Sequence, residues 1–303
     1  QELDRVLGGG LMPGSLILLG GEPGIGKSTL VAQAADAIGR QSLVIYASGE
    51  ESAGQIKSRF DRLKIKAGNI KFLNETNAEK IIATIKELKP ALVIIDSIQT
   101  IYSASIAGEA GNLNQIRGSA VNFLEAAKTN NIAIILIGHI TKDGSLAGPK
   151  SLEHIVDTVL YLETETNHGY RILRAAKNRF GSINEIGVFE MTASGFKEIS
   201  NPSSVFLDAN QNFTGSVISC VVEGTRPFLI EVQALVTKTV FGYPQRKASG
   251  FDLNRLSVLI AVLTKRAGLN LNNQDVILNV TGGLHISDPN LDLAVCLAIA
   301  SSL

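Results

Sequence analysis

Residues 15–28 read Ser-Leu-Ile-Leu-Leu-Gly-Gly-Glu-Pro-Gly-Ile-Gly-Lys-Ser, and this stretch decides the fold of the chain. The apolar run at 15–20 predicts a buried strand, and the pattern after it predicts a helix that continues to about Ile38. Between them, residues 21–28 fit the pattern G-x-x-x-x-G-K-[ST] of a phosphate-binding loop. A chance glycine turn is the alternative, but the strand before the turn and the helix after it make that alternative poor.

The chemistry of phosphate binding explains the residue types in this loop. Glycines let backbone N–H groups turn toward phosphate oxygens, and the amino end of the following helix favours an anion. Lys27 is expected to reach the β- and γ-phosphates of ATP, and the Ser28 hydroxyl is expected to bind Mg²⁺. The expected nucleotide-contacting residues are Gly21, Glu22, Pro23, Gly24, Ile25, Gly26, Lys27, Ser28 and Thr29.

Strand and helix patterns alternate along the first half of the chain. Further strands are predicted at 42–47, 70–73, 91–95 and 132–137, with helices from Asn77 to Leu88 and from about Asn112 to Lys128. This alternation predicts right-handed parallel βαβ units. The segments 158–162, 170–175 and 185–190 then read as consecutive strands with turns between them. The predicted fold class is α/β, a mostly parallel sheet with an antiparallel extension.

A boundary is predicted near Ser200–Ser204, which divides the chain into an ATPase domain at 1–200 and a smaller α+β domain at 205–303. In the second domain, strands at 217–223 and 228–236 flank a turn at 224–227 and predict a hairpin. A helix at 253–267, a strand at 276–280 and a helix at 291–303 follow. Because this last pattern runs to the end of the chain, the second domain is expected to be truncated.

Composition narrows the function classes. The chain has 303 residues, of which 45% are hydrophobic, and its 28 Lys and Arg balance its 28 Asp and Glu. Any nucleic-acid-binding surface must therefore be local. No apolar run is long enough to span a membrane, so no membrane association is expected. Cys220 and Cys296 are expected to be reduced core residues of a cytoplasmic protein.

Acidic and polar residues follow three of the predicted strands. Asp96 ends an apolar strand and is expected to hold Mg²⁺. Glu50 and Glu51 follow another strand; either could activate the attacking water, and Glu50 is favoured as the base. His139 follows a third strand and is expected to sense the γ-phosphate. The alternatives without a catalytic role are that Asp96 caps a helix, that Glu50 and Glu51 are solvated loop residues, and that His139 is an ordinary polar residue at the end of a strand.

Two loops suit contact with a nucleic-acid backbone. Residues 102–112 are small and polar and contain glycine, and residues 141–150 carry Lys142 and Lys150 between glycines, directly after His139. Lysine–phosphate contacts would be independent of sequence and sensitive to salt. If the chain acts on DNA, Lys142 and Lys150 are the residues expected to make these contacts.

Six motifs in order indicate a family. They are Leu-Asp-Arg-Val-Leu-Gly-Gly-Gly at 3–10, the phosphate loop, Ser-Gly-Glu-Glu-Ser at 48–52, Asp-Ser-Ile-Gln at 96–99, Gly-His-Ile-Thr-Lys-Asp-Gly-Ser-Leu-Ala-Gly-Pro-Lys at 138–150 and Lys-Asn-Arg-Phe-Gly at 177–181. The set closely resembles the bacterial RadA (Sms) family of RecA-related DNA repair and recombination proteins, and the resemblance covers essentially the whole chain. The last motif distinguishes this family from RecA itself.

The resemblance implies an ATP-driven motor with a RecA-like core. It implies a homo-oligomeric, hexameric ring on single-stranded DNA that has helicase-type activity, drives branch migration of recombination intermediates and works with a RecA-type recombinase. Lys177 and Arg179 would act as catalytic residues on the ATP of the neighbouring subunit. A nucleotide-dependent assembly switch of the RecA/KaiC kind, without translocation, remains the alternative.

Two departures from the family pattern are expected. Family members carry an amino-terminal four-cysteine zinc finger, which this chain begins after, so zinc is expected only there. They end in a domain resembling the Lon protease domain, of which this chain is expected to hold part. By approximate alignment, Leu291 stands where a Lon-type serine nucleophile would be. Since leucine has no hydroxyl, a Ser-Lys peptidase is disfavoured, and the domain is expected to be proteolytically inactive.

Overall fold

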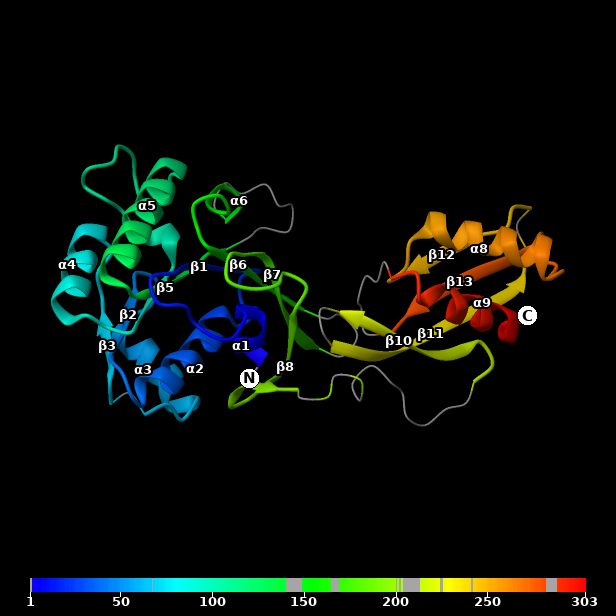
Figure 1. The fold of residues 1–303 in the computed structure, drawn as a ribbon, viewed down its shortest axis with the longest axis horizontal. Coiled ribbons are helices and arrows are strands. Elements are labelled where there is room, and N and C mark those ends of the chain that lie inside the picture. Colours follow the sequence, from blue (N-terminus) through cyan, green and yellow to red (C-terminus); the bar gives the residue numbers. More distant parts are fainter. Residues whose placement is uncertain are drawn as a thin grey trace. The chain divides into compact units, whose positions relative to one another are not determined.

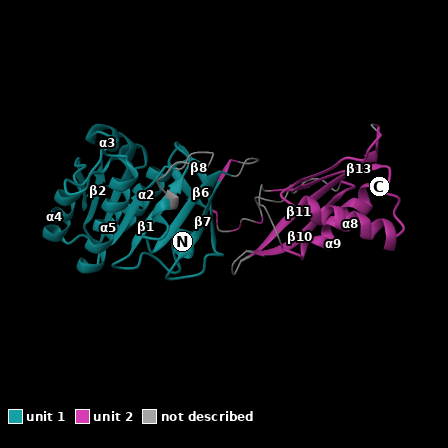
Figure 2. Cartoon of the chain, turned by 90° about the horizontal axis from the view of Figure 1, so that it is seen from above, with its two compact units in different colours: residues 1–164, 171–198 teal, residues 165–170, 199–303 magenta. Residues whose placement is uncertain are grey.

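The computed structural model describes residues 2–66, 68–139, 149–164, 169–199, 201, 203, 213–223, 226–240, 242–281 and 288–303 (Figure 1). The chain forms two compact units, one of residues 1–164 and 171–198 and one of residues 165–170 and 199–303 (Figure 2). Each unit is described by itself. Across the described ranges, no helix is long and apolar enough to cross a membrane.

The first unit is built on a nine-stranded sheet with the order β3-β2-β4-β5-β1-β6-β7-β8-β9. Its strands are β1 (Leu16–Gly21), β2 (Val44–Ser48), β3 (Ile70–Leu73), β4 (Leu92–Asp96), β5 (Ala133–Ile137), β6 (Thr158–Thr164), β7 (Tyr170–Asn178), β8 (Ile186–Thr192) and β9 (Gly195–Glu198). Neighbours from β3 to β6 pair in parallel, while β6 pairs antiparallel with β7 and β8 with β9. The predicted parallel sheet with an antiparallel extension is confirmed.

Side chains along each central strand point alternately to the two faces of the sheet, and both faces are apolar. Helices therefore cover both faces, and each face has its own hydrophobic core. The helices are α1 (Glu2–Leu7), α2 (Lys27–Gly39), α3 (Ala53–Arg62), α4 (Ala78–Leu88), α5 (Leu113–Asn130) and α6 (Pro149–Leu152), with a 3₁₀ turn η1 (Ile98–Thr100). Ile17 and Leu19 of β1 join the core under α1, α2 and α3, whereas Leu16 and Leu18 join the core under α4 and α5. The central strands are therefore buried on both faces, as their continuous apolar runs predicted.

Side chains cap the helices where the sequence indicates starts. The Asn77 side chain accepts a hydrogen bond from the Lys80 N–H at 2.9 Å, which confirms the predicted start of α4. Asn112 caps α5 in the same way. In α3, Ser52 and Gln55 form a reciprocal capping box directly after the two candidate glutamates. This cap fixes where the chain turns from the loop after β2 into the helix.

In its described residues, the second unit is a smaller mixed sheet accompanied by the helices α8 and α9. Its elements are β10 (Ser216–Glu223), β11 (Arg226–Lys238), β12 (Arg246–Ser249), α8 (Leu253–Arg266), β13 (Gln274–Val280) and α9 (Leu291–Ser302), with the strand order β10-β11-β13-β12. The predicted hairpin is confirmed, because Glu223 and Arg226 pair at its closed end. Both cysteines are free, but the prediction that both lie in the core is wrong for Cys220. Its side chain lies on an exposed face of β10, opposite Leu229.

Candidate nucleotide site

The phosphate loop lies between β1 and α2, as predicted. Gly26 is the residue before α2 and has φ +113°, a left-handed conformation that favours glycine. A Cβ at Gly26 would lie 2.5 Å from Met191 Cε and 2.8 Å from Phe196 Cζ. Since Gly26 has no side chain, it cannot cap the first N–H groups of α2, and the first turn holds no acidic residue. These N–H groups are suited to an anionic ligand.

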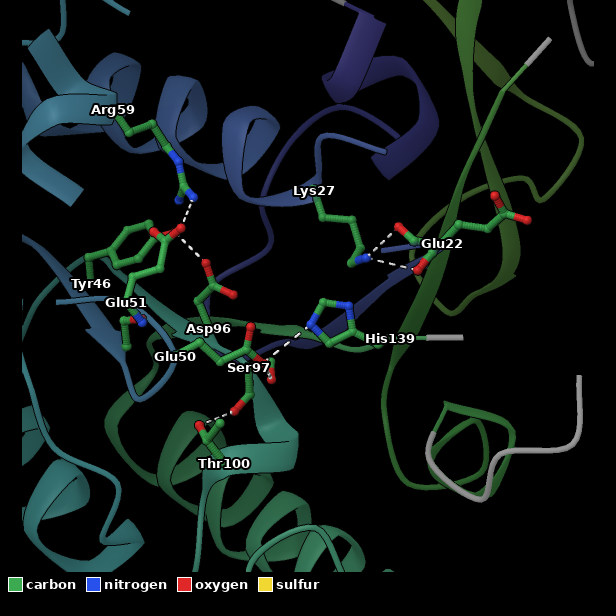
Figure 3. Close-up of polar contacts among 12 residues, drawn as sticks. Glu22, Lys27, Tyr46, Glu50, Glu51, Arg59, Asp96, Ser97, Thr100 and His139 are labelled. Atoms are coloured by element: carbon green, nitrogen blue, oxygen red, sulfur yellow. Dashed lines mark hydrogen bonds and ion pairs between the residues drawn. The ribbon is translucent and has the colours of Figure 1, made fainter. Parts of the chain in front are cut away.

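Lys27 is the first residue of α2 and is 4% exposed. Its Nζ donates hydrogen bonds to the Gly21 carbonyl at 2.8 Å and to the Glu22 carbonyl at 2.9 Å (Figure 3). Burial lowers the pKa of Lys27, while the nearby carboxylates of Asp96 and Glu50 act in the opposite direction. The structure thus brings these three predicted site residues into one electrostatic environment.

Asp96 ends β4, beside Ser48 at the end of β2. It is 3% exposed, and its Oδ2 accepts a hydrogen bond of 2.7 Å from the Tyr46 hydroxyl (Figure 3). Sequence reasoning missed Tyr46. The available signal was a hydroxyl-bearing side chain inside an apolar strand, because a buried tyrosine hydroxyl usually finds a partner.

The side chains of the two adjacent glutamates have different partners. Glu51 forms an ion pair with Arg59 of α3, and its backbone N–H donates to Ser48 Oγ at 3.2 Å. Glu50 turns the other way: its Oε1 accepts a hydrogen bond from Ser97 Oγ (Figure 3). Of the two glutamates, Glu50 is the one whose charge acts on Lys27, whereas Glu51 is paired with Arg59.

Gly49 explains how the chain reaches these positions. A Cβ at Gly49 would lie 2.5 Å from both Thr100 Oγ1 and Thr76 Cγ2. Only glycine therefore fits between the turn that follows β4 and the segment before α4. This close approach sets the backbone immediately before Glu50.

His139 follows β5 and lies next to Glu50, with 3.3 Å between His139 Nε2 and Glu50 Oε1 (Figure 3). His139 Nδ1 is buried and has no hydrogen-bond partner in the part of the chain that the structure describes. Three strands of the sheet therefore deliver Glu50, Asp96 and His139 to the carboxyl edge, where β1 delivers the phosphate loop.

Lys177 and Arg179 lie elsewhere. Lys177 is near the end of β7, and its Nζ donates to the Glu153 carbonyl at 2.6 Å and to the Val156 carbonyl at 2.7 Å. Burial and the positive charge of Arg179 lower the pKa of Lys177. Arg179 Nη1 lies 3.2 Å from Oδ1 of Asp157.

The contacts of Asp157 show that Lys177 and Arg179 lie at the edge of the sheet where β1 begins. Asp157 Oδ2 accepts a hydrogen bond from the backbone N–H of Leu16, the first residue of β1, and another from Lys128. The phosphate loop begins at Gly21, the other end of this six-residue strand. At roughly 3.3 Å per residue, the five steps from Leu16 to Gly21 separate the two edges by about 17 Å. The structure does not bring Lys177 and Arg179 to the phosphate loop of their own chain.

The first and last of the six motifs pack together. Asn178 Nδ2 donates to the Val6 carbonyl at 3.2 Å, and Gly8, at φ +85°, faces Gly181. A Cβ at Gly8 would lie 2.9 Å from the Gly181 Cα. The two glycines thus allow the backbone around Arg179 to lie directly against the turn that follows α1.

The two predicted DNA-contacting loops have different outcomes. Lys142 lies outside the described residues, and Lys150 belongs to α6 but its side chain is not described. The loop at 102–112 is held by Gln115, which is 1% exposed. Gln115 accepts from the Ser103 N–H at 2.8 Å and donates to the Gly108 carbonyl at 2.9 Å. Its conformation is therefore fixed from within the domain.

The donors at the site fit a hard divalent cation bound together with a nucleotide. Ser28 and Asp96 offer oxygen ligands, the type that Mg²⁺ prefers. Within the described ranges, no group of three His, Cys, Asp or Glu residues could hold a metal by itself. In sites of this kind, Mg²⁺ takes its remaining ligands from phosphate oxygens and water.

Comparisons with known proteins give matches that cover the chain. A family model described as AAA domain matches residues 1–145. The chain is similar to "DNA repair protein RadA" of Streptococcus pneumoniae, at 54% identity over 100% of this chain and 72% of the relative. It is 52% identical to the RadA protein of Halalkalibacterium halodurans, over 100% of this chain and 66% of the relative. For the RadA protein of Bacillus subtilis the figures are 51%, 99% and 66%.

Solved structures share the fold of the first unit. The crystal structure of the RadB recombinase matches with a TM-score of 0.52 at 23% identity, over 66% of this chain and 97% of that chain. The flagellar accessory protein FlaH from Methanocaldococcus jannaschii matches with a TM-score of 0.51 at 18% identity, over 66% and 95%. These matches concern the fold alone, and they confirm the predicted RecA-like core.

Proposed function

Because the chain belongs to the RadA family of DNA repair proteins, we propose that it is an ATP-driven motor that acts on single-stranded DNA and branched recombination intermediates. The motor is a homo-oligomeric, hexameric ring with helicase-type activity that drives branch migration in the cytoplasm beside a RecA-type recombinase. The chain spans 66–72% of the length of the relatives compared above.

The observation that carries this proposal is the meeting of the phosphate loop, Glu50, Asp96 and His139 at one edge of the sheet. Lys27 holds the terminal phosphates, and Glu50 orients and deprotonates the attacking water. Ser28 and Asp96 hold Mg²⁺, which would supply charge neutralisation at the phosphate oxygens. The Glu51–Arg59 pair supports Glu50 as the base, because it ties the other glutamate to α3.

Ring assembly is supported by the place of the two remaining cations. Lys177 and Arg179 lie at the edge opposite their own phosphate loop. A neighbouring subunit could present them to this chain's ATP, where a cation stabilises the charge that develops during phosphoryl transfer. A site that needs residues of two subunits couples hydrolysis to assembly.

Coupling to DNA is proposed to run from Glu50 through His139 into the segment that follows it. The contact between His139 Nε2 and Glu50 Oε1 supports this route, because a change at Glu50 reaches His139 directly. Lys142 and Lys150 follow in sequence and would contact the DNA backbone.

The second unit is proposed to serve ring assembly and DNA binding without peptidase activity. Leu291, which stands where a serine nucleophile is expected, is the first residue of α9 and is fully buried. Its side chain packs in the core of the unit and offers no nucleophile.

One experiment separates the motor from an assembly switch. ATP turnover is measured with and without single-stranded DNA, and fork or D-loop remodelling is followed in parallel, with Lys27→Ala as the inactive control. The motor predicts turnover stimulated by DNA together with strand displacement, both lost in Lys27→Ala. DNA that changes neither turnover nor oligomeric state would support the switch, and absence of turnover in the wild type would refute the ATPase assignment.

A further inference from the structure

Tyr46 lies in the middle of β2, a strand whose five residues are all buried. Its side chain is fully buried, and its ring packs against Phe60 and Phe72, with centroid distances of 6.1 Å and 5.9 Å. Aromatic contacts from α3 and β3 therefore fix the ring, and with it the place of the hydroxyl at its tip.

The hydroxyl meets the carboxylate of Asp96. Tyr46 Oη donates to Asp96 Oδ2 at 2.7 Å, the usual length of a strong O–H···O bond (Figure 3). Throughout the described part of the chain, no other side chain hydrogen-bonds to this carboxylate.

The hydrogen bond from Tyr46 affects the orientation of the Asp96 carboxylate. This bond restrains the rotation of the carboxylate, and among the described residues Oδ1 accepts no side-chain hydrogen bond. Groups that hydrogen-bond a metal ligand hold that ligand in the orientation the metal requires, and removing them typically weakens metal binding by roughly 10–100-fold.

We propose that Tyr46 is a positioning residue for the divalent cation, acting through Asp96 by fixing which carboxylate oxygen faces the metal. This inference rests on the proposed nucleotide site, since it assigns a role within that site. It extends the set of residues responsible for metal binding from the edge of the sheet to its buried interior.

The test is the affinity for Mn²⁺, measured by electron paramagnetic resonance at saturating non-hydrolysable ATP analogue, in the wild type and in Tyr46→Phe. Because this substitution keeps the ring, the fold should be retained, and circular dichroism and nucleotide binding in EDTA should match the wild type. We expect Mn²⁺ affinity to fall about 10-fold or more.

A matched control is Tyr161→Phe, because the Tyr161 hydroxyl also donates to a carboxylate, at 2.8 Å to Glu153. It should leave Mn²⁺ affinity unchanged. In an Asp96→Asn background, Tyr46→Phe should produce no further loss. Equal Mn²⁺ affinity in Tyr46→Phe and the wild type would overturn the positioning role alone. A wild type that binds no Mn²⁺ with the analogue would overturn the proposed site as well.

Discussion

Arg179 and Lys27 lie at opposite edges of the same sheet. Arg179 pairs with Asp157, whose carboxylate accepts a hydrogen bond from Leu16 at the start of β1. Lys27 donates a hydrogen bond to the carbonyl of Gly21 at the end of the same strand. In the proposed mechanism, one chain would therefore carry two halves of a phosphoryl-transfer site that lie too far apart to meet within it. This separation leads to predictions that distinguish residues acting in their own site from residues acting in a neighbour's site.

Replacing Arg179 with alanine should reduce ATP turnover by roughly 10³-fold or more while ATP affinity is retained, because a cation supplied by another subunit acts mainly on the transition state. Steady-state turnover and equilibrium nucleotide binding measure the two effects. Arg174→Ala is the control, since Arg174 lies on β7, the strand that ends just before Arg179, and pairs with Glu163. A comparable loss in both variants would indicate a structural effect on β7.

Substitutions of Glu50 and Glu51 should have different effects on ATP turnover, because the two side chains have different partners. Glu50→Gln removes the proposed base and should lower turnover by roughly 10²–10⁴-fold with ATP binding intact. Glu51→Gln breaks a partly buried ion pair with Arg59 and should cost only about 1 kcal/mol of stability, with a far smaller effect on turnover. Steady-state ATP hydrolysis is measured for both variants. A larger loss of turnover in Glu51→Gln than in Glu50→Gln would show that Glu51 is the base.

Asp157 should make folding stability depend on pH. Burial acts to raise the pKa of Asp157, but hydrogen bonds from Lys128 and the Leu16 N–H, with the charges of Lys128 and Arg179, outweigh it and lower the pKa. A depressed folded-state pKa stabilises the protein above the unfolded value of about 3.9. That stabilisation is lost as the pH falls through the folded-state pKa.

Asp157→Asn should therefore reduce the free energy of unfolding by about 2 kcal/mol at pH 7, and the difference from the wild type should shrink as the pH falls below about 4. Urea unfolding at several pH values measures this. Asp36→Asn, which removes an exposed pair with Arg40, should cost at most about 1 kcal/mol. A difference that does not vary with pH would argue against charge as the cause.

Two glycines near Glu50 should respond in opposite directions to the same change. Gly49→Ala places a methyl group 2.5 Å from Thr76 and Thr100 and should cost about 1–3 kcal/mol. Gly54→Ala, in α3, meets no atom closer than 4.0 Å and should stabilise by about 0.5 kcal/mol. Thermal unfolding of the two variants tests this, and a stable Gly49→Ala would show that the loop before Glu50 can move.

The sequence predicted the architecture because its signals are local. The apolar strands, the capping residues Asn77 and Asn112 and the phosphate loop each depend on neighbours in the chain. The placement of Asp96 and His139 also followed from strand ends alone, since parallel strands deliver their carboxyl ends to one edge.

Contacts between distant segments could not be predicted in this way. The hydrogen bond from Tyr46 to Asp96 spans 50 residues, and the packing of Gly8 against Gly181 joins opposite ends of the first unit. Cys220 was wrongly placed in the core because the sequence of an apolar strand does not show which face of the sheet the helices cover. Pairing and packing, rather than local pattern, determine these features.

Mixing two inactive variants tests the shared site most directly. Lys27→Ala subunits lack a working phosphate loop but can present Arg179, and Arg179→Ala subunits have the converse defect. When the two are mixed in equal amounts and allowed to exchange, head-to-tail neighbours should rebuild on the order of one working site in four. ATP turnover should then rise far above the sum of the separate variants. Turnover equal to that sum, in rings shown to have exchanged subunits, would contradict a site shared between neighbours.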